Sequence, residues 1–362
     1  MRIVILTNSD VGLYKFRREL LEKLCNNHEV FIVLPNGPYI KEMESIGCKY
    51  IPFEFNRRGK NPLADIMQVK RYIDLLKAIK PALVLTYTIK PNIYGGIACQ
   101  ITNIPYIANI TGLGTAIENR GWINVIGINL YKMGLRKAKC VFFQNKENQK
   151  VFIRKKIVCG RTELLPGSGV NLTQYKYEKY PNENKSIRFL FVGRIMKDKG
   201  IEELLTSMEK IYKKNKNVIL DIVGPCEEDY TTLLAQAEKK GFVHYFGFQK
   251  NIHSFYKNCH CVVLPSYHEG LANVLLEGAA TGRPVIATNV PGCQETFTEG
   301  VTGFGCELKN LDSLKQAIEK FLCLSEDKHI EMGKNARRKI EKEFNRKFVI
   351  EAYLKKIAEL DN

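Results

Sequence analysis

Two glutamates stand eight positions apart in the stretch PSYHEGLANVLLE, residues 265–277. Glu269 and Glu277 bracket a mostly apolar run, where an acid loses free energy unless it has a partner. If both residues were helical, they would lie roughly 80° apart around the axis and about 12 Å apart along it. The two carboxylates therefore cannot share one proton, but they can hold two ends of an elongated ligand. Each carboxylate oxygen accepts from a different O–H, so vicinal hydroxyls are suitable partners.

Two cations follow a predicted strand in the stretch FVGRIMKDKG, residues 191–200. Gly193 ends the strand and allows a ligand to approach the backbone closely. Arg194 and Lys199 then precede a predicted helix, and cations beside a helix N-terminus favour the binding of a diphosphate. Taken alone, the pattern fits a surface pair of basic residues equally well.

Glycines and cations also follow predicted strands in the first half of the chain. SDVGLYKFRREL places Gly12 at the end of the first strand and Arg17 on the helix that follows. TYTIKPNIYGG places Lys90 after a strand, and NITGLGTA places Gly112 and Gly114 after another. The glycine pair matches only a fragment of a dinucleotide-binding fingerprint, because the acid that should follow is missing. On their own these residues do not identify a ligand.

The 11 cysteines are scattered singly, and no pair has the spacing of a zinc ribbon or a redox dithiol. Cys259 and Cys261 flank His260 and could suggest a metal, but a structural zinc needs four ligands. We interpret this stretch as a buried helix end that runs into a strand. The sequence thus predicts no metal site, and reduced thiols in a reducing compartment.

The elements that must position these residues alternate between apolar strands and amphipathic helices. We predict strands at residues 2–8, 28–35, 82–88, 106–112 and 140–145, and again at 187–194, 218–224, 243–248, 261–266 and 284–288. This alternation predicts an α/β protein with two Rossmann-like, doubly wound parallel-sheet domains facing an interdomain cleft. Ligands of such sheets bind at the carboxyl ends of the strands, so we expect the chemistry in the loops that follow strands.

The boundary between the domains is expected near residue 180. Residues 171–186 are polar, contain Pro181 and show no periodicity, which is typical of a linker. We therefore predict domains at 1–180 and 181–342, with the C-terminal helix, about 343–362, packing back on the first. No signal peptide is seen and no apolar run approaches the roughly 20 residues of a membrane span, so we expect a cytoplasmic protein.

The formal net charge of +17 is concentrated in the first half of the chain. Residues 1–180 contain 28 Lys and Arg against 13 Asp and Glu, whereas residues 181–362 contain 27 against 25. The first half should therefore face nucleic acid, an anionic membrane or a phosphate-bearing substrate, unless the charge only maintains solubility. Nucleic-acid binding would require interleaved aromatic residues or a reader motif, and neither is found.

The stretch GWINVIGINLYKMGLRKAK combines an apolar segment with a basic end. Its cations are Lys132, Arg136, Lys137 and Lys139. Such a helix could lie on an anionic bilayer. It could equally be an ordinary packed helix with a charged end.

Together the motifs resemble those of the retaining family-4 glycosyltransferases, which have the GT-B fold. Glu269, seven residues and Glu277 match the paired-Glu motif of that family. The pieces GRIMKDKG, VGPCEED, FGF, VVLPS, GRPVIAT, GCQETF and EGVTGF follow in the family's order. The resemblance covers essentially the whole chain and is most specific over residues 189–305. TIKPNIYGG and NITGLGTA look most like members that extend undecaprenyl-diphosphate-linked glycans.

The resemblance implies roles for individual residues. Glu277 would grip the ribose of a nucleotide sugar, Glu269 would contact the donor sugar, and Arg194 and Lys199 would neutralise the donor diphosphate. Arg194, Lys199 and Glu269 are then the candidate catalytic residues. The expected donor-binding set is completed by Gly193, Gly270, Leu271, Ala272, Asn273 and Val274, and the expected acceptor-binding set is Gly12, Arg17, Lys90, Gly112 and Gly114.

One departure from the family concerns a histidine that many members carry near the NITGLG position. Here that place is occupied by Asn109, Ile110 or Thr111, so we assign no catalytic histidine.

The resemblance also implies the reaction. It predicts transfer of a sugar from a UDP-sugar to a lipid-diphosphate-linked glycan, with retention and without metal or cofactor. Because the family's acceptors are often lipid-linked, it also favours a peripheral position on the anionic inner face of the cell membrane. N-acetylgalactosamine, or another hexose or N-acetylhexosamine, is the expected sugar, and the leaving diphosphate is the expected base. A nucleotide-sugar epimerase of the same fold and a basic nucleic-acid-binding protein are the alternatives.

Overall fold

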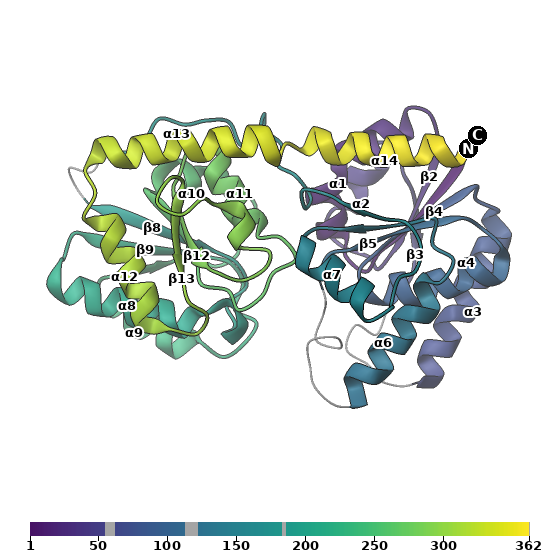
Figure 1. The fold of residues 1–362 in the computed structure, drawn as a ribbon, viewed down its shortest axis with the longest axis horizontal. Helices are drawn as coiled ribbons and strands as arrows, with labels where there is room; N and C mark the ends of the chain where they lie inside the picture. Colours follow the sequence, from purple (N-terminus) through teal and green to yellow (C-terminus); the bar gives the residue numbers. More distant parts are fainter. Residues whose placement is uncertain (55–61, 113–121, 183–185, 362) are drawn as a thin grey trace. The chain divides into compact units, whose positions relative to one another are not determined.

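The chain forms two compact units (Figure 1). The structure is a computed structural model that describes residues 1–54, 62–112, 122–182 and 186–361. Unit 1 contains Met1–Ser168 together with Ile350–Asn362, and unit 2 contains Gly169–Val349. Each unit has its own parallel sheet covered by helices, so the predicted α/β class with two doubly wound sheets is confirmed.

The sheet of unit 1 has the strand order β3-β2-β1-β4-β5-β6-β7, and all its pairs are parallel. Its central strands read as continuous apolar runs because both faces of the sheet are covered. The order reverses between β1 and β4, which makes this the switch point of the sheet. The strands are β1 (Arg2–Leu6), β2 (Glu29–Leu34), β3 (Lys49–Pro52), β4 (Leu83–Tyr87), β5 (Tyr106–Ile110), β6 (Cys140–Phe143) and β7 (Thr162–Leu164).

The helices of unit 1 connect successive strands of this sheet (Figure 1). They are α1 (Asp10–Cys25), α2 (Ile40–Ser45), α3 (Pro62–Ile79), α4 (Gly96–Thr102), α6 (Trp122–Leu135) and α7 (Lys146–Arg154), with a π-helix, η1 (Pro91–Gly95), directly before α4. The last helix of the chain, α14 (Arg346–Asp361), belongs to unit 1 from Ile350 onward. Its Tyr353 packs on Phe142 with ring centroids 4.7 Å apart.

The sheet of unit 2 has the order β10-β9-β8-β11-β12-β13, again all parallel, with its switch point between β8 and β11. The strands are β8 (Ile187–Val192), β9 (Val218–Val223), β10 (Val243–Tyr245), β11 (Cys261–Leu264), β12 (Val285–Thr288) and β13 (Gly303–Cys306). The helices are α8 (Ile201–Lys214), α9 (Thr231–Lys239), α10 (His253–Asn258), α11 (Asn273–Ala280), α12 (Leu311–Leu322) and α13 (Glu326–Glu343).

The segment that we interpreted as a linker is part of unit 2. Tyr175 and Tyr180 are buried, and Tyr175 belongs to the apolar core of this unit. The Tyr180 hydroxyl donates to the His260 carbonyl oxygen over 3.0 Å. The unit boundary lies at Ser168–Gly169, so residue 180 falls inside unit 2. Composition suggested a linker because the segment is polar overall, whereas two tyrosines anchor it.

Candidate functional site

The loops after β8 and β11 meet at the switch point of unit 2. Gly200, which ends the first loop, has a φ of 68°, and a Cβ atom there would lie 2.2 Å from the Pro265 carbonyl oxygen. The Tyr267 N–H donates to the Asp198 carbonyl oxygen over 2.8 Å. Two stretches that are far apart in the sequence, 191–200 and 265–277, are thus brought together by adjacent strands.

Two of the predicted site residues contact each other directly. Lys199 forms an ion pair with Glu269, and each side chain is 16% exposed. The Glu269 backbone is fixed from the other side by Gly292, where a Cβ atom would lie 2.4 Å from the Glu269 carbonyl oxygen. A cation and a carboxylate are therefore held together on adjacent loops, where a ligand could contact both.

Arg194 lies on the same loop as Lys199 but has a different partner. Its Nη1 donates to the Oε2 atom of Glu227 over 2.9 Å, and Glu227 follows β9. The next acid, Glu228, accepts the backbone N–H of Lys197 over 2.8 Å. The sequence indicates the cation but not Glu227, because spacing along the chain gives no sign of a contact between loops.

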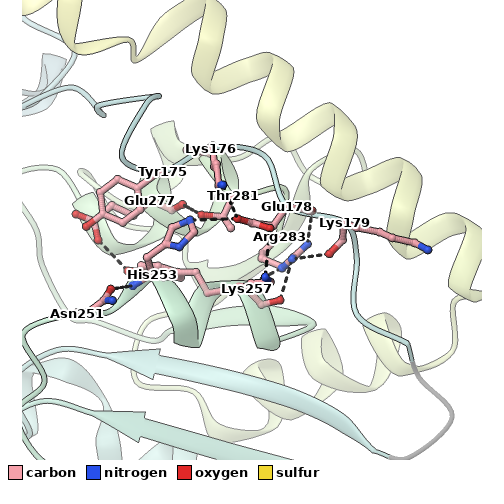
Figure 2. Close-up of polar contacts among 12 residues, drawn as sticks. Tyr175, Lys176, Glu178, Lys179, Asn251, His253, Lys257, Glu277, Thr281 and Arg283 are labelled. Atoms are coloured by element: carbon pink, nitrogen blue, oxygen red, sulfur yellow. Dashed lines mark hydrogen bonds and ion pairs between the residues drawn. The ribbon is translucent and has the colours of Figure 1, made fainter.

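Glu277 lies in α11 and is buried. The Tyr256 hydroxyl donates to its Oε2 atom over 2.9 Å, and Tyr175 lies beside it (Figure 2). Burial and the nearby Glu277 carboxylate raise the pKa of Tyr256 and of Tyr175 well above the usual value of a phenol. Both phenols therefore stay protonated and can donate. Neither tyrosine was predicted as a site residue.

Part of the backbone between Glu269 and Glu277 already forms hydrogen bonds within the chain. α11 begins at Asn273, and the Ala272 N–H donates to the Gly292 carbonyl oxygen over 2.7 Å. The Asn273 N–H lies 2.9 Å from the Leu271 carbonyl oxygen. These two N–H groups thus have acceptors within the chain. The Oδ1 atom of Asn273, in contrast, is buried and has no hydrogen-bond partner among the described residues. Gly270 and Val274 are half-buried on either side of this turn.

Arg283, in the stretch GRPVIAT, has a structural role. It is fully buried and donates to the carbonyl oxygens of five residues (Figure 2). The acceptors are Tyr256, Glu178, Gly282, Lys179 and Lys257, at 2.8–3.2 Å. The guanidinium thereby fastens residues 178–179 to the end of α10, close to Glu277.

The residues predicted for acceptor binding lie in unit 1 and have different local surroundings. Gly12 is in the first turn of α1 rather than in a loop, and its N–H donates to the Ser9 hydroxyl over 3.0 Å. Lys90, just before η1, forms a 3.1 Å ion pair with Asp65 of α3. Gly112 is half-buried two residues after β5, and Gly114 lies outside the described residues.

Arg17 is only 4% exposed, which the sequence did not indicate. Its guanidinium lies 5.5 Å from the ring centroid of Tyr87 and 5.9 Å from that of Tyr353. The Tyr353 hydroxyl accepts a 2.7 Å hydrogen bond from Asn109. Of the three residues that we compared with the histidine of the resembled family, Asn109 and Ile110 are buried and Thr111 is exposed.

The cysteine–histidine stretch is the buried helix end that runs into a strand, as we expected from the sequence. Cys259 and Cys261 are buried, and the Nδ1 atom of His260 accepts the Arg188 N–H over 2.9 Å. The described residues contain no group of three or more His, Cys, Asp or Glu side chains that could hold a metal ion. Among the same residues, no helix combines the length and apolar character needed to cross a membrane.

Two family models match the chain. Residues 174–339 match the model described as Glycosyl transferases group 1. Residues 2–145 match the model described as Glycosyl transferase 4-like. The first match lies within unit 2 and contains the paired carboxylates and the two cations, and the second lies within unit 1.

Two curated relatives match over nearly the whole chain. The chain is 26% identical over 354 residues to the N,N'-diacetylbacillosaminyl-diphospho-undecaprenol alpha-1,3-N-acetylgalactosaminyltransferase of Campylobacter jejuni, covering 93% of each chain. It is 28% identical over 366 residues to the capsular polysaccharide biosynthesis glycosyltransferase CapM of Staphylococcus aureus, covering 96% of this chain and 94% of the relative.

A solved structure with the same fold is Anabaena Alr3699/HepE in complex with UDP and glucose. The TM-score is 0.82 at 19% identity, and the match covers 99% of this chain and all of that one. At this identity the likeness shows that the two chains share a fold.

Proposed function

We propose that this chain, which belongs to the glycosyltransferases and has the GT-B fold, transfers a sugar from a UDP-sugar to a lipid-diphosphate-linked glycan. Its N-terminal part matches the Glycosyl transferase 4-like model, and its C-terminal part matches the Glycosyl transferases group 1 model. The observation that carries this proposal is the contact of Lys199 with Glu269, which joins the segments that follow the adjacent strands β8 and β11. The first segment also carries Arg194 and the second continues into α11 with Glu277, so together they supply cations for a diphosphate and carboxylates for hydroxyl groups.

The proposed donor is UDP-N-acetylgalactosamine. The Campylobacter relative is named as an N-acetylgalactosaminyltransferase that uses an undecaprenol-diphosphate acceptor, and the similarity extends over 93% of both chains. Within this chain, Glu277 is proposed to accept the ribose hydroxyls and Glu269 those of the donor sugar. Both carboxylates have acceptor capacity for this, since each oxygen carries two lone pairs.

The proposed reaction retains the anomeric configuration and uses no metal. Negative charge grows on the diphosphate as the glycosidic bond breaks, and positioned cations stabilise such charge in the transition state. Arg194 and Lys199 would supply this stabilisation. Lys199 already holds Glu269, so it would sit between the diphosphate and the sugar. The departing phosphate would take the proton of the attacking hydroxyl on the same face.

The acceptor side is assigned to unit 1. Lys90 and Gly112 follow β4 and β5 at the carboxyl edge of the sheet, where a ligand is expected. Gly12 is proposed to let the acceptor approach the first turn of α1. Arg17 is buried, so it would support this edge through Tyr87 and Tyr353 rather than touch the acceptor.

A peripheral position on the inner face of the membrane completes the proposal. Apolar side chains are exposed on two helices of unit 1, namely Ile66 and Met67 on α3 and Val125, Ile126 and Met133 on α6. Arg136, Lys137 and Lys139 are exposed directly after α6. Apolar groups beside cations are suited to the interface of an anionic bilayer.

Incubation with a panel of UDP-sugars and an undecaprenyl-diphosphate-linked saccharide tests this function. We expect one UDP-sugar to be consumed, with release of UDP and a lengthened glycan whose new linkage has the configuration of the donor. The yield should be unchanged in EDTA. Interconversion of UDP-sugars without transfer would establish an epimerase instead, and an inverted linkage would refute retention.

A further inference from the structure

The loop after β9 carries three consecutive acids, Glu227, Glu228 and Asp229, next to the cations of the proposed donor site. Only Glu227 forms an ion pair with one of those cations, Arg194. We propose that Glu227 competes with the donor diphosphate for Arg194 and so limits how tightly UDP is held. This inference rests on the proposed function, in which Arg194 binds the diphosphate.

The backbone fixes Glu227 close to Arg194. The Ile195 N–H donates to the Pro225 carbonyl oxygen over 2.8 Å, and the Glu227 N–H donates back to the Ile195 carbonyl oxygen over 3.1 Å. At the base of the two loops, a Cβ atom on Gly224 would lie 1.8 Å from the Gly193 carbonyl oxygen. The two loops are therefore in backbone contact. This contact keeps Glu227 close to Arg194 independently of their flexible side chains.

The other two acids of the loop have different surroundings. Glu228 accepts the Lys197 backbone N–H, so its carboxylate is occupied by the loop itself. Asp229 is exposed and forms no ion pair with any described residue. The loop thus offers a matched comparison, because Glu227 and Asp229 carry the same charge while only Glu227 contacts Arg194.

Competition follows from the position of this pair. A diphosphate that binds Arg194 must either displace Glu227 or leave a carboxylate beside the phosphate, where like charges repel. Arg194 is 54% exposed and Glu227 is 32% exposed, so the pair is a surface pair and is weak enough to exchange partners. The product UDP carries the same diphosphate as the donor. Glu227 should therefore weaken the binding of both and speed the release of UDP.

The pair of Lys199 and Glu269 differs in this respect. Both of its members are proposed to touch the donor, one through phosphate and the other through sugar, so donor binding can keep them together. Glu227 has no such donor contact in the proposal. Its effect should consequently appear in UDP affinity and in product inhibition rather than in the chemical step.

Calorimetric titration with UDP at low salt tests this inference on the wild type and four variants: Glu227→Gln, Asp229→Asn, Arg194→Ala and Arg194→Ala/Glu227→Gln. We expect Glu227→Gln to bind UDP about two- to fivefold more tightly, the range expected of an exposed ion pair. The gain should shrink at high salt, where exposed charges are screened. Product inhibition by UDP should strengthen by the same factor, with kcat for transfer not increased.

The controls separate this inference from the proposed function. Asp229→Asn should leave UDP affinity nearly unchanged, and adding Glu227→Gln to Arg194→Ala should bring no further gain. Equal gains in Glu227→Gln and Asp229→Asn, or no gain in either, would overturn the competition. If Arg194→Ala itself left UDP affinity unchanged, the assignment of Arg194 to the diphosphate would fail instead.

Discussion

Glu277 is buried and accepts a hydrogen bond from Tyr256, so a ribose would have to share its carboxylate with a phenol. We expect Glu277→Gln to weaken UDP and the UDP-sugar alike, by about ten- to a hundredfold, because both contain ribose and lose a charge-assisted hydrogen bond. Glu269→Gln should instead lower turnover far more than UDP affinity. Calorimetry with both ligands, combined with transfer rates, measures the difference.

The variant Tyr256→Phe is the control for this comparison. It removes the hydroxyl that donates to Glu277 and should reduce the free energy of unfolding by about 1–3 kcal/mol, because a buried carboxylate loses a donor. UDP affinity should change less than in Glu277→Gln. If Glu277→Gln and Glu269→Gln weakened UDP equally, the division of roles between the two acids would be wrong.

Lys199 and Lys197 lie in the same turn but differ in their surroundings. Lys199 pairs with Glu269, whereas Lys197 is exposed. We expect Lys199→Ala to lower kcat by about 30- to 1,000-fold, because one positioned cation is worth roughly 2–4 kcal/mol in the transition state. Lys197→Ala should leave kcat nearly unchanged. Similar losses in both variants would mean that the turn contributes only net charge.

The sequence identified the charged residues of unit 2 but not their partners. Glu269 and Lys199 could be found because spacing and neighbouring glycines mark the loops that carry them. Tyr175, Tyr256 and Glu227 could not, because each lies on a segment that only the fold brings to the site. Arg17 shows the opposite error. We predicted it to bind the acceptor, whereas it is buried and Tyr353 from the last helix of the chain packs beside it.

At the scale of elements, Gly200 determines how closely the loop after β8 can approach β11. We expect Gly200→Ala to lower the free energy of unfolding by more than the cost of its positive φ alone. A positive φ costs about 1–2 kcal/mol with a side chain, and a Cβ atom would also lie 2.2 Å from the Pro265 carbonyl oxygen. Urea denaturation measures the loss.

Gly247→Ala separates the two contributions to that loss. Gly247 also has a positive φ, 62°, but no heavy atom lies within 4 Å of its would-be Cβ atom. It should therefore lose only the backbone part, about 1–2 kcal/mol. Equal losses at Gly200 and Gly247 would show that the loops can separate without a further energetic penalty.

Within the described part of the chain, the strands that the sequence did not reveal are all edge strands. β3, β7 and β13 were missed, and each lies at the end of a sheet. An edge strand has one neighbour and needs less apolar surface, so its composition differs little from that of a loop. β13 illustrates this, since its sequence is GFGC. The central strands were found because burial on both faces demands continuous apolar runs.

At the scale of the whole molecule, the charge is divided unequally between the two units. Unit 1 contains 28 basic and 15 acidic residues, a net charge of +13, whereas unit 2 contains 27 and 23, a net charge of +4. The exposed apolar residues of α3 and α6 lie in the strongly basic unit. An anionic surface should therefore bind unit 1 and leave UDP binding by the donor residues of unit 2 unaffected.

We accordingly expect the protein to sediment with vesicles that contain anionic lipid and much less with neutral vesicles. Each cation near such a surface contributes about 1 kcal/mol, within a Debye length. Replacing Arg136, Lys137 and Lys139 with Gln should therefore reduce the bound fraction without changing UDP affinity. High salt should release most of the protein, and any apolar contact through α6 would retain the remainder.

The same loss of charge in unit 2 provides the control for vesicle binding. Lys334, Arg338 and Lys342 are exposed on α13, so their replacement with Gln removes three cations from the less basic unit. Net charge then falls equally in the two triple variants, and only the variant in unit 1 should lose vesicle binding. Equal losses would mean that attraction depends on total charge and not on a surface of unit 1. If the wild type ignored anionic vesicles at low salt, the acceptor would have to be sought among soluble glycans.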